Sequence, residues 1–287
     1  MNSLADLKRR IASVKQTGRI TGAMETISIA KMHKAIELYE SNNAYFDMLE
    51  SFVKEIAAAN ADAVRETAAP PQSGYDIVVA IASDKGFCGA FNHDVFRLTD
   101  SLITDNTLLI PVGQTTADYY SSEKQITKDR VDARFVSCAY SPDLKNAKAI
   151  SECILSRYGK DAKSATLVYN GMVGHSSWAV KKKSILPLTV DDGDAEVCGM
   201  EFEPSPKEVF KLLLPRYIDG IIYGALVHSG AAEHSARRAA MSAATKNADA
   251  MIDELSVEYN RARQSAVTSQ ITEIIGSTQA IGANNER

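Results

Sequence analysis

Proline is missing from both ends of the chain. All eight prolines of the 287 residues lie between positions 70 and 215, so residues 1–69 and 216–287 contain none. An interior proline costs a helix roughly 3 kcal/mol. Proline-free flanks of this size therefore favour one very long helix at each end of the chain.

Other absences exclude several classes of protein. The longest apolar runs, such as residues 77–82, fall far short of the roughly 18 residues that a membrane-spanning helix needs. The N-terminal stretch has no apolar run of signal-peptide length, so we expect no export. The cysteines have no CxxC spacing and are expected to be reduced core thiols, with no disulfide framework and no zinc site. They are Cys88, Cys138, Cys153 and Cys198.

Motifs for metal and nucleotide chemistry are missing too. The five histidines show no ligand spacing such as HExxH, so no metal site is expected. Neither GxGxxG nor GxxxxGKS/T occurs in the chain. With a pI near 5.8 and one tryptophan, nucleic acid is a weak candidate partner. A hydrophobic content of 45% excludes a disordered chain.

Both ends carry helical periodicity. Apolar residues step by three and four through residues 4–27 and again through 252–271. We expect helices over about 3–60 and about 206–276, the second with a kink at Pro215. They would be roughly 80 Å and 100 Å long, too long for a compact globule, so they must pair as an antiparallel coiled coil. The charged residues expected on outward faces of the second helix are Arg237, Arg238, Asp253, Glu258 and Arg261.

The expected seam between these helices consists mainly of small residues. Small residues let helix axes approach closely but bury little apolar area, which indicates a thin pair supported by an enclosing partner. Composition alone equally allows a plain structural coiled coil with a suboptimal sequence. The polar tail at 282–287 is expected to be disordered. The seam residues are Gly18, Thr21, Gly22 and Ala23 on the first helix and Ala231, Ala232, Ala236, Ala239, Ala243, Ala244 and Ala248 on the second.

The middle of the chain has a different pattern. Runs rich in β-branched residues alternate with short helical patterns, which predicts an inserted α/β domain of Rossmann-like type with a largely parallel sheet. The predicted division is residues 1–69 for the N-terminal helix, 70–200 for the insert and 201–287 for the C-terminal helix. The expected strands are 75–82, 107–112, 133–139, 165–170 and about 184–188, and the expected helices about 91–103, 114–122 and 143–158.

The segment Ser83 to Asn92 is the candidate anion-binding loop of this domain. It follows the first expected strand and precedes a helix, which is where α/β domains bind phosphate. Its glycine spacing does not match a phosphate-binding motif. Within it, Cys88 is more commonly a buried structural thiol than a nucleophile. The residues thus leave open a soluble α/β nucleotide-binding enzyme with a helical oligomerisation arm.

Charge favours a protein partner. Residues 1–40 contain seven basic and four acidic residues, although the whole chain has a net charge of −4. A basic helix suits an acidic protein surface.

Three separated motifs resemble the gamma subunit of F-type ATP synthase, bacterial type. They follow the family's order and cover both ends and the insert. On the first helix the motif is Ile11-Ala12-Ser13-Val14, Thr17, Ile20-Thr21, Ala23-Met24 and Lys31-Met32. After the first strand it is Ser83-Asp84-Lys85-Gly86-Phe87-Cys88-Gly89. Near the C-terminus it comprises Glu233 to Arg237, Met241 to Ala248, Tyr259 to Gln264 and Ile271 to Ile274.

The resemblance implies the central rotor stalk of the F1 sector. Such a subunit rotates inside the alpha3beta3 ring and couples ion flow through the membrane c-ring to ATP synthesis or hydrolysis. It performs no bond chemistry and needs no cofactor. The implied partners are alpha, beta, epsilon and the c-ring, with one copy per complex. The implied location is peripheral, on the cytoplasmic face of the bacterial cell membrane.

The resemblance also implies roles for individual residues. Contacts to beta are implied for Met24, Lys85, Gly86, Cys88, Arg263 and Gln264. Ile271 and Ile274 match the shaft tip inside the apolar bearing of alpha and beta. Met200, Phe202 and Glu203 match the foot on the c-ring and epsilon, where the family often has tyrosines.

Overall fold

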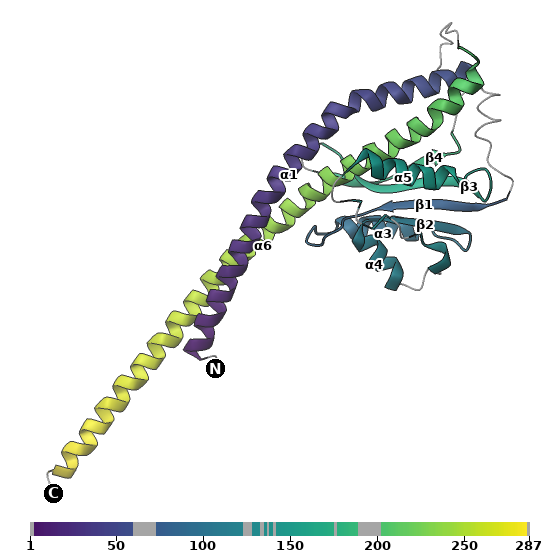
Figure 1. Cartoon of the computed structure of the whole chain (residues 1–287). Helices are drawn as coiled ribbons and strands as arrows, with labels where there is room; N and C mark the ends of the chain where they lie inside the picture. Colours follow the sequence, from purple (N-terminus) through teal and green to yellow (C-terminus); the bar gives the residue numbers. More distant parts are fainter. Residues whose placement is uncertain are drawn as a thin grey trace. The chain divides into compact units, whose positions relative to one another are not determined.

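Two long helices begin and end the chain. The computed structural model describes residues 3–59, 73–122, 128–132, 135–136, 138–139, 142–174, 177–188 and 202–285. Helix α1 spans Leu4–Ala59 and helix α6 spans Pro206–Asn285, with Pro215 inside it (Figure 1). The helical bounds of α1 match the expectation. Helix α6 continues into the polar tail expected to be disordered, where no proline stops it. Within the described residues, no helix is both long and apolar enough to cross a membrane.

The chain divides into two compact units. Met1–Thr26 with Ala240–Arg287 form one, here called the paired-helix unit, and Ile27–Ala239 form the other, the α/β unit. Each unit contains part of α1 and part of α6. The sequence-based boundaries at 69/70 and 200/201 fall on residues outside the described part of the chain and stay predictions.

In the paired-helix unit, α1 and α6 run antiparallel. A Cβ built on Gly18 lies 3.4 Å from the Cβ of Ala248, and the hydroxyls of Thr21 and Thr245 are 2.7 Å apart. Residues further along α1 contact residues earlier in α6, so the two helices run antiparallel. These contacts lie between small residues of the expected seam and Thr245, so close approach of the axes is confirmed here.

The end of α6 extends past the start of α1. The register of Gly18 with Ala248 places Leu4 opposite residues of α6 that precede Ile271. Ile271 and Ile274 are 51% and 64% exposed. The segment of α6 around Ile271 and Ile274 therefore presents large apolar side chains beyond the start of α1.

The α/β unit contains one four-stranded sheet. Its strands have the order β2-β1-β3-β4. Strand β1 pairs in parallel with both β2 and β3, and β4 pairs antiparallel with β3, so the largely parallel sheet is confirmed. The bounds are β1 Tyr75–Ile81, β2 Thr107–Val112, β3 Ala162–Met172 and β4 Trp178–Leu186.

Side chains of β1 enter a core on each face of the sheet. Ile77 and Val79 join a core with α5 (Leu144–Leu155), α6 and the end of α1. Val78 and Ala80 join a second core with α3 (Phe91–Asp100) and α4 (Gln114–Ser122). In Figure 1, α3 and α4 accordingly lie on one side of the sheet and α5 and α6 on the other. Burial on both faces explains why β1 is an unbroken apolar run.

Several expected elements differ from the structure, including β3, which is longer than the expected 165–170, and α3, which ends at Asp100. The described residues of 133–139 form no regular strand, and Val131 and Phe135 make single bridges to β2. Strand β4 begins at Trp178, earlier than expected. The expected start was late because lysines at 181–183, which an edge strand tolerates, interrupt the apolar pattern. Helix α5 ends at Leu155, and a turn containing Gly159 with φ of 81° follows it.

Two histidines, the partly buried His228 and the buried His234, lie on the α6 segment of the α/β unit. The His228 ring contacts Tyr39, with centroids 3.9 Å apart, and His234 is 9% exposed. Among the described residues, neither Nδ1 atom has a hydrogen-bond partner. Burial is the main cause that lowers the pKa of both to about 4, and nearby cations, including Lys181 beside His228 and Arg237 beside His234, contribute to that shift. Both rings are therefore neutral at pH 7.

We predict that the chain loses stability as the pH falls from about 6.5 toward about 4. In this window the unfolded chain binds protons at these histidines and the folded chain does not, so protonation favours unfolding. Urea unfolding at pH 7 and pH 5 measures the loss. The variant His228→Phe with His234→Leu is expected to lose less stability between these pH values, whereas His33→Leu at an exposed site should behave like the parent. An equal loss in all three would contradict the prediction.

Candidate functional site

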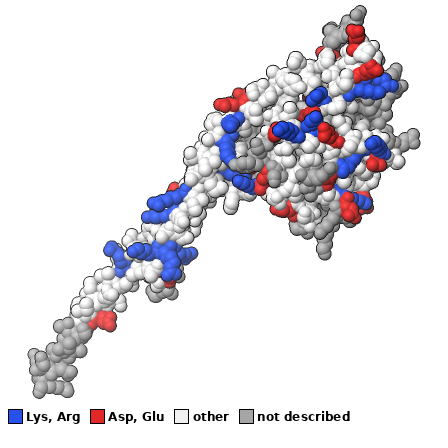
Figure 2. Space-filling view, in the orientation of Figure 1, with Lys and Arg blue, Asp and Glu red and all other residues white. Residues whose placement is uncertain are grey.

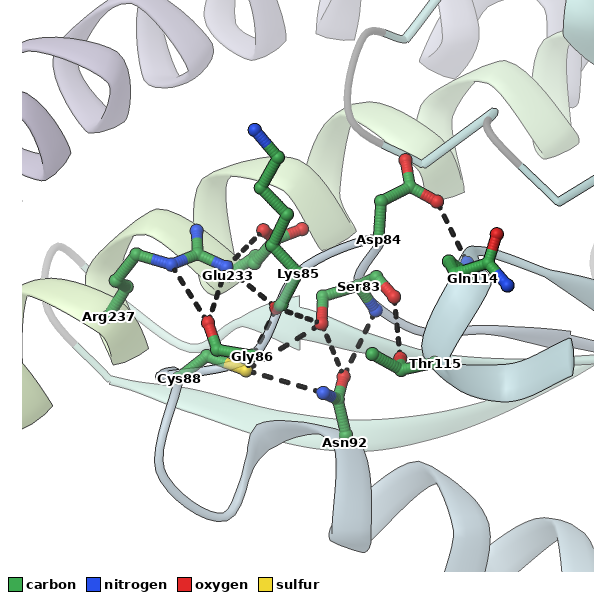
Figure 3. Close-up of polar contacts among 10 residues, drawn as sticks. All are labelled: Ser83, Asp84, Lys85, Gly86, Cys88, Asn92, Gln114, Thr115, Glu233 and Arg237. Atoms are coloured by element: carbon green, nitrogen blue, oxygen red, sulfur yellow. Dashed lines mark hydrogen bonds and ion pairs between the residues drawn. The ribbon is translucent and has the colours of Figure 1, made fainter. Parts of the chain in front are cut away.

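The loop from Ser83 to Asn92 connects β1 to α3 at the carboxyl end of β1. Figure 3 shows that it lies between the start of α4 on one side and α6 on the other. Ser83 N donates to Asn92 Oδ1 at 3.0 Å, and Asn92 Nδ2 donates to Cys88 Sγ at 3.4 Å. Ser83 Oγ donates to the Lys85 carbonyl at 2.7 Å. These bonds close the loop on itself.

The start of α4 anchors the first residues of the loop. The backbone N–H of Gln114 donates to Asp84 Oδ1 at 2.9 Å, and the Thr115 hydroxyl donates to the Ser83 carbonyl. Asp84 thereby accepts from a backbone N–H of the first turn of α4, where a carboxylate also interacts favourably with the helix dipole. These contacts fix the first residues of the loop to the start of α4.

Helix α6 holds the loop from its other side through an ion pair. Arg237 Nη2 lies 2.7 Å from Glu233 Oε1, and the same nitrogen donates to the Lys85 carbonyl at 3.0 Å. Arg237 Nε donates to the Gly86 carbonyl at 3.3 Å. Arg237 is 8% and Glu233 3% exposed. We call Glu233, Arg237 and these two carbonyls the loop clamp.

Two effects within the clamp shift the pKa of Glu233 in opposite directions. Burial raises the pKa of the Glu233 carboxyl, whereas the charge and hydrogen bond of Arg237 lower it. A guanidinium satisfies the carboxylate and the two carbonyls together because its donors form a rigid planar fork. The clamp therefore adds donors to two carbonyls of the loop, one of which also accepts from Ser83 Oγ.

This geometry does not suit a phosphate. A phosphate-binding loop directs backbone N–H groups at the anion, whereas here the carbonyls of Lys85 and Gly86 converge on a cation. Cys88 is 2% exposed, and burial raises the pKa of its thiol, which keeps it protonated and unreactive. The arrangement argues against the nucleotide-binding enzyme.

The tip of the loop faces solvent. Phe87 is 72% exposed and has φ of 63°, a left-handed conformation that side-chain-bearing residues rarely adopt. Lys85 and Gly86 beside it are also exposed, while Cys88 is buried. The loop clamp therefore presents an aromatic ring and a lysine on a rigid support.

The other sequence-predicted residues lie elsewhere in the chain. Met24 is partly buried on α1, and Arg263 and Gln264 are exposed on α6, all in the paired-helix unit with Ile271 and Ile274. In the α/β unit, Phe202 packs against the core with α5 and α6, and Glu203 is exposed. Met200 lies outside the described residues.

Two expectations about α6 are wrong. Arg237 was expected on an outward face and is buried in the clamp, because the loop covers that face. Ala232 and Ala236, expected at the seam, pack with Cys88 and Phe91. The sequence signal for the clamp was the Glu233 and Arg237 spacing of i,i+4 within an alanine-rich run, which marks an ion pair on one helix face.

The fold is that of ATP synthase central stalk structures. It resembles a chain in the structure of Euglena gracilis mitochondrial ATP synthase, OSCP/F1/c-ring, with a TM-score of 0.74 and 17% identity over 99% of this chain and 96% of that one. A chain of the Tetrahymena thermophila mitochondrial ATP synthase central stalk/c-ring gives a TM-score of 0.56 and 23% identity, covering 78% of this chain and 99% of that one.

Sequence comparison identifies the family. A family model described as ATP synthase matches residues 3–281. The chain is 33% identical to the ATP synthase gamma chain of Ruminiclostridium cellulolyticum, over 98% of this chain and 99% of the relative. It is 29% identical to the sodium ion specific ATP synthase gamma chain of Acetobacterium woodii, over 97% and 99%. The chain therefore belongs to the ATP synthase gamma chain family, whose members are subunits of the complex and are not themselves catalytic.

We predict that Arg237→Met destabilises the chain by about 3 kcal/mol or more. The variant leaves Glu233 buried without its partner and removes donors from two loop carbonyls. Urea unfolding of the full chain measures the change in the free energy of unfolding.

The matched control is Arg97→Met. Arg97 pairs with Asp94 at 3.2 Å on α3, but the Arg97 side chain is 76% exposed, so its loss should cost below about 1 kcal/mol. Equal destabilisation by Arg237→Met and Arg97→Met would show that the clamp does not hold the loop.

Proposed function

We propose that the chain is the central rotor stalk of the F1 sector of a bacterial-type ATP synthase. In this role it turns inside the alpha3beta3 ring and biases the three catalytic sites in turn, because each beta subunit meets a different part of its surface. A surface can shift the equilibrium of beta only through contacts that differ between the states of beta. The subunit itself carries out no bond chemistry.

The uncovered end of α6 is the observation that carries this proposal. Ile271 and Ile274 are large, apolar and about half exposed or more. Exposed apolar residues grouped in this way mark a surface that a partner covers. We infer that they form the shaft tip within an apolar bearing of alpha and beta.

The basic surface of the N-terminal part of α1 supports the inference of an acidic partner. Lys8, Arg9, Arg10, Lys15 and Arg19 are all exposed. Basic side chains also gather on the paired helices in Figure 2. We infer that beta presents acidic segments to this surface, to Met24 and to the loop tip at Lys85 and Gly86. Because Cys88 is buried, a contact through this residue would involve its backbone.

The remaining partners follow from family membership. We infer that the segment with Met200, Phe202 and Glu203 is the foot on the c-ring and epsilon subunit, and that one copy of the chain is present in each complex. The chain would then be peripheral, on the cytoplasmic face of the bacterial cell membrane, and reach the membrane through these partners.

Reconstitution tests the rotor role. The full chain mixed with alpha and beta subunits is expected to yield a species with one copy per alpha3beta3 hexamer in native mass measurement. Tight nucleotide binding with turnover by the isolated chain, together with no such species, would favour the enzyme instead.

Arg263 and Gln264 test the contact to beta. We predict that Arg263→Ala with Gln264→Ala leaves assembly intact but lowers ATP-driven ion pumping by the complex. Charge-assisted hydrogen bonds worth about 2 kcal/mol would be lost at the moving interface.

The matched control is Lys246→Ala with Asn247→Ala. It also removes one cation and one amide from exposed positions of α6. Pumping that is unchanged in the first variant, or lowered equally in both, would contradict the assigned role.

A further inference from the structure

Helix α1 is lightly buried between Met32 and Val53. Those two side chains are 6% and 2% exposed, whereas no side chain described between them is buried. A cleft of about 190 Å³ lies beside this segment, between α1, α6, β3 and β4. Segments with few buried contacts open locally at a smaller free-energy cost than the rest of a domain. The segment between Met32 and Val53, here called the α1 midsection, is therefore suited to local opening.

His228 of α6 packs against the α1 midsection. Its ring centroid lies 3.9 Å from that of Tyr39 in α1, with the planes at 61°, and 6.5 Å from that of Tyr169 in β3. The Nδ1 atom of His228 is buried and has no hydrogen-bond partner among the described residues. The imidazole thus joins three elements by ring packing, and no acceptor among those residues stabilises a proton at Nδ1.

Two lysines of β4 place positive charge beside this ring. Lys181 lies directly opposite Tyr169 in the register of β3 and β4, and Lys183, two residues further on, shares its face of the sheet. Lys181 Nζ donates to the Met172 carbonyl at 3.4 Å. Lys183 Nζ lies 3.2 Å from Glu50 Oε2. These contacts hold both ammonium groups at the junction of α1, α6 and the sheet.

The charges that act on His228 oppose its protonation. Burial is the main cause that lowers its pKa to about 4, and Lys181 and Lys183 contribute to that shift. The carboxylates that line the cleft, Asp47 and Glu50, already have interactions within the chain. A proton on the packed ring therefore meets two ammonium groups, whereas a proton on a ring released to water does not. The titratable groups around the ring and the cleft are Tyr39, Asp47 and Glu50 of α1, Tyr169 of β3, Lys181 and Lys183 of β4 and Tyr217 of α6.

We propose that His228 is a proton-sensitive latch: the neutral ring holds the α1 midsection on α6 and the sheet, and the protonated ring releases it. The closed form binds a proton at His228 less tightly than an open form in which water surrounds the ring, so acid favours opening. The latch is a property of the chain alone. If the chain is the rotor proposed above, opening would loosen one of its two stalk helices, a consequence that rests on that proposal.

Native-state hydrogen exchange of the full chain at pH 7 and pH 5 tests the latch. With the pKa of His228 at about 4 in the closed form and at its usual 6.5 in the open form, the equilibrium constant for opening rises about twentyfold between these pH values. After correction for intrinsic exchange rates, the backbone amides of residues 36–42 should lose protection by this factor. Low urea concentrations should barely change their exchange, because local opening exposes little surface, whereas amides of β1 should be better protected and strongly urea-dependent.

Variants of the two α6 histidines assign the effect to one ring. His228→Phe keeps an aromatic ring against Tyr39 and removes the proton site, so the loss of protection at residues 36–42 should fall below about twofold. His234→Leu removes the other titrating ring of α6, which does not line the cleft. The loss at residues 36–42 should then be as large as in the parent.

Two lysine variants test the cause without changing the ring. Lys181→Met removes a cation beside His228, so the pKa of His228 measured by NMR of its ring protons should rise, and the acid-induced loss of protection should be smaller. Lys182→Met is the matched control, because Lys182 is exposed and its side chain points to the other face of β4. It should leave both values as in the parent. This pair decides the proposal even if His228→Phe does not fold.

The proposal is overturned by any of three results. The first is no loss of protection at residues 36–42 of the parent at pH 5. The second is an equal loss in the parent and His228→Phe, or equal behaviour of Lys181→Met and Lys182→Met. The third is exchange of these amides with the same protection and urea dependence as β1, which would mean that α1 opens only when the whole unit unfolds. The experiment uses the chain alone, so its outcome is independent of assembly with alpha and beta.

Discussion

The close antiparallel packing of α6 on its neighbours is the constraint on which the rest of the structure depends. In the paired-helix unit, Gly18 meets Ala248 of α6, and Thr21 meets Thr245. In the α/β unit, Gly220 of α6 brings its backbone so near Leu49 that a Cβ would lie 3.2 Å from that side chain. Small residues make both contacts possible. They also explain why glycine is kept in a helix despite its cost of up to about 1 kcal/mol relative to alanine.

The same helix uses a second face for the loop after β1. Ala232 and Ala236 pack with Cys88 and Phe91, and the clamp forms on the adjoining turn at Arg237. A buried ion pair is weak evidence of stabilisation in itself, because desolvation offsets the attraction. Here the guanidinium also satisfies two backbone carbonyls, which an apolar pair could not do. The clamp therefore specifies one loop conformation.

Sequence patterns predicted the bounds of the helices and strands better than they predicted which elements pack against each other. The absence of proline and the apolar period gave the bounds of α1 closely, and β2 and α4 agree with the expected ranges because each has a simple local pattern. Strand β4 was placed too late because its lysines lie at an edge, where polar residues are tolerated. The clamp joins residues 151 positions apart, and no local pattern specifies which face of α6 receives the loop. Arg237 was accordingly assigned to the outside, as an arginine on a helix normally is.

Phe87 combines two unfavourable features at one position. Its left-handed backbone costs roughly 1–2 kcal/mol for a residue with a side chain, and its ring is 72% exposed. Folding alone gains nothing from this arrangement, since a glycine would remove the backbone strain and a polar side chain the exposure. Strain that persists because the surroundings hold it is typical of functional sites. The clamp supplies those surroundings by binding the two carbonyls immediately before Phe87. A partner that covers the ring would remove its exposure and offset the strain. The rotor proposal assigns such a partner contact to this loop.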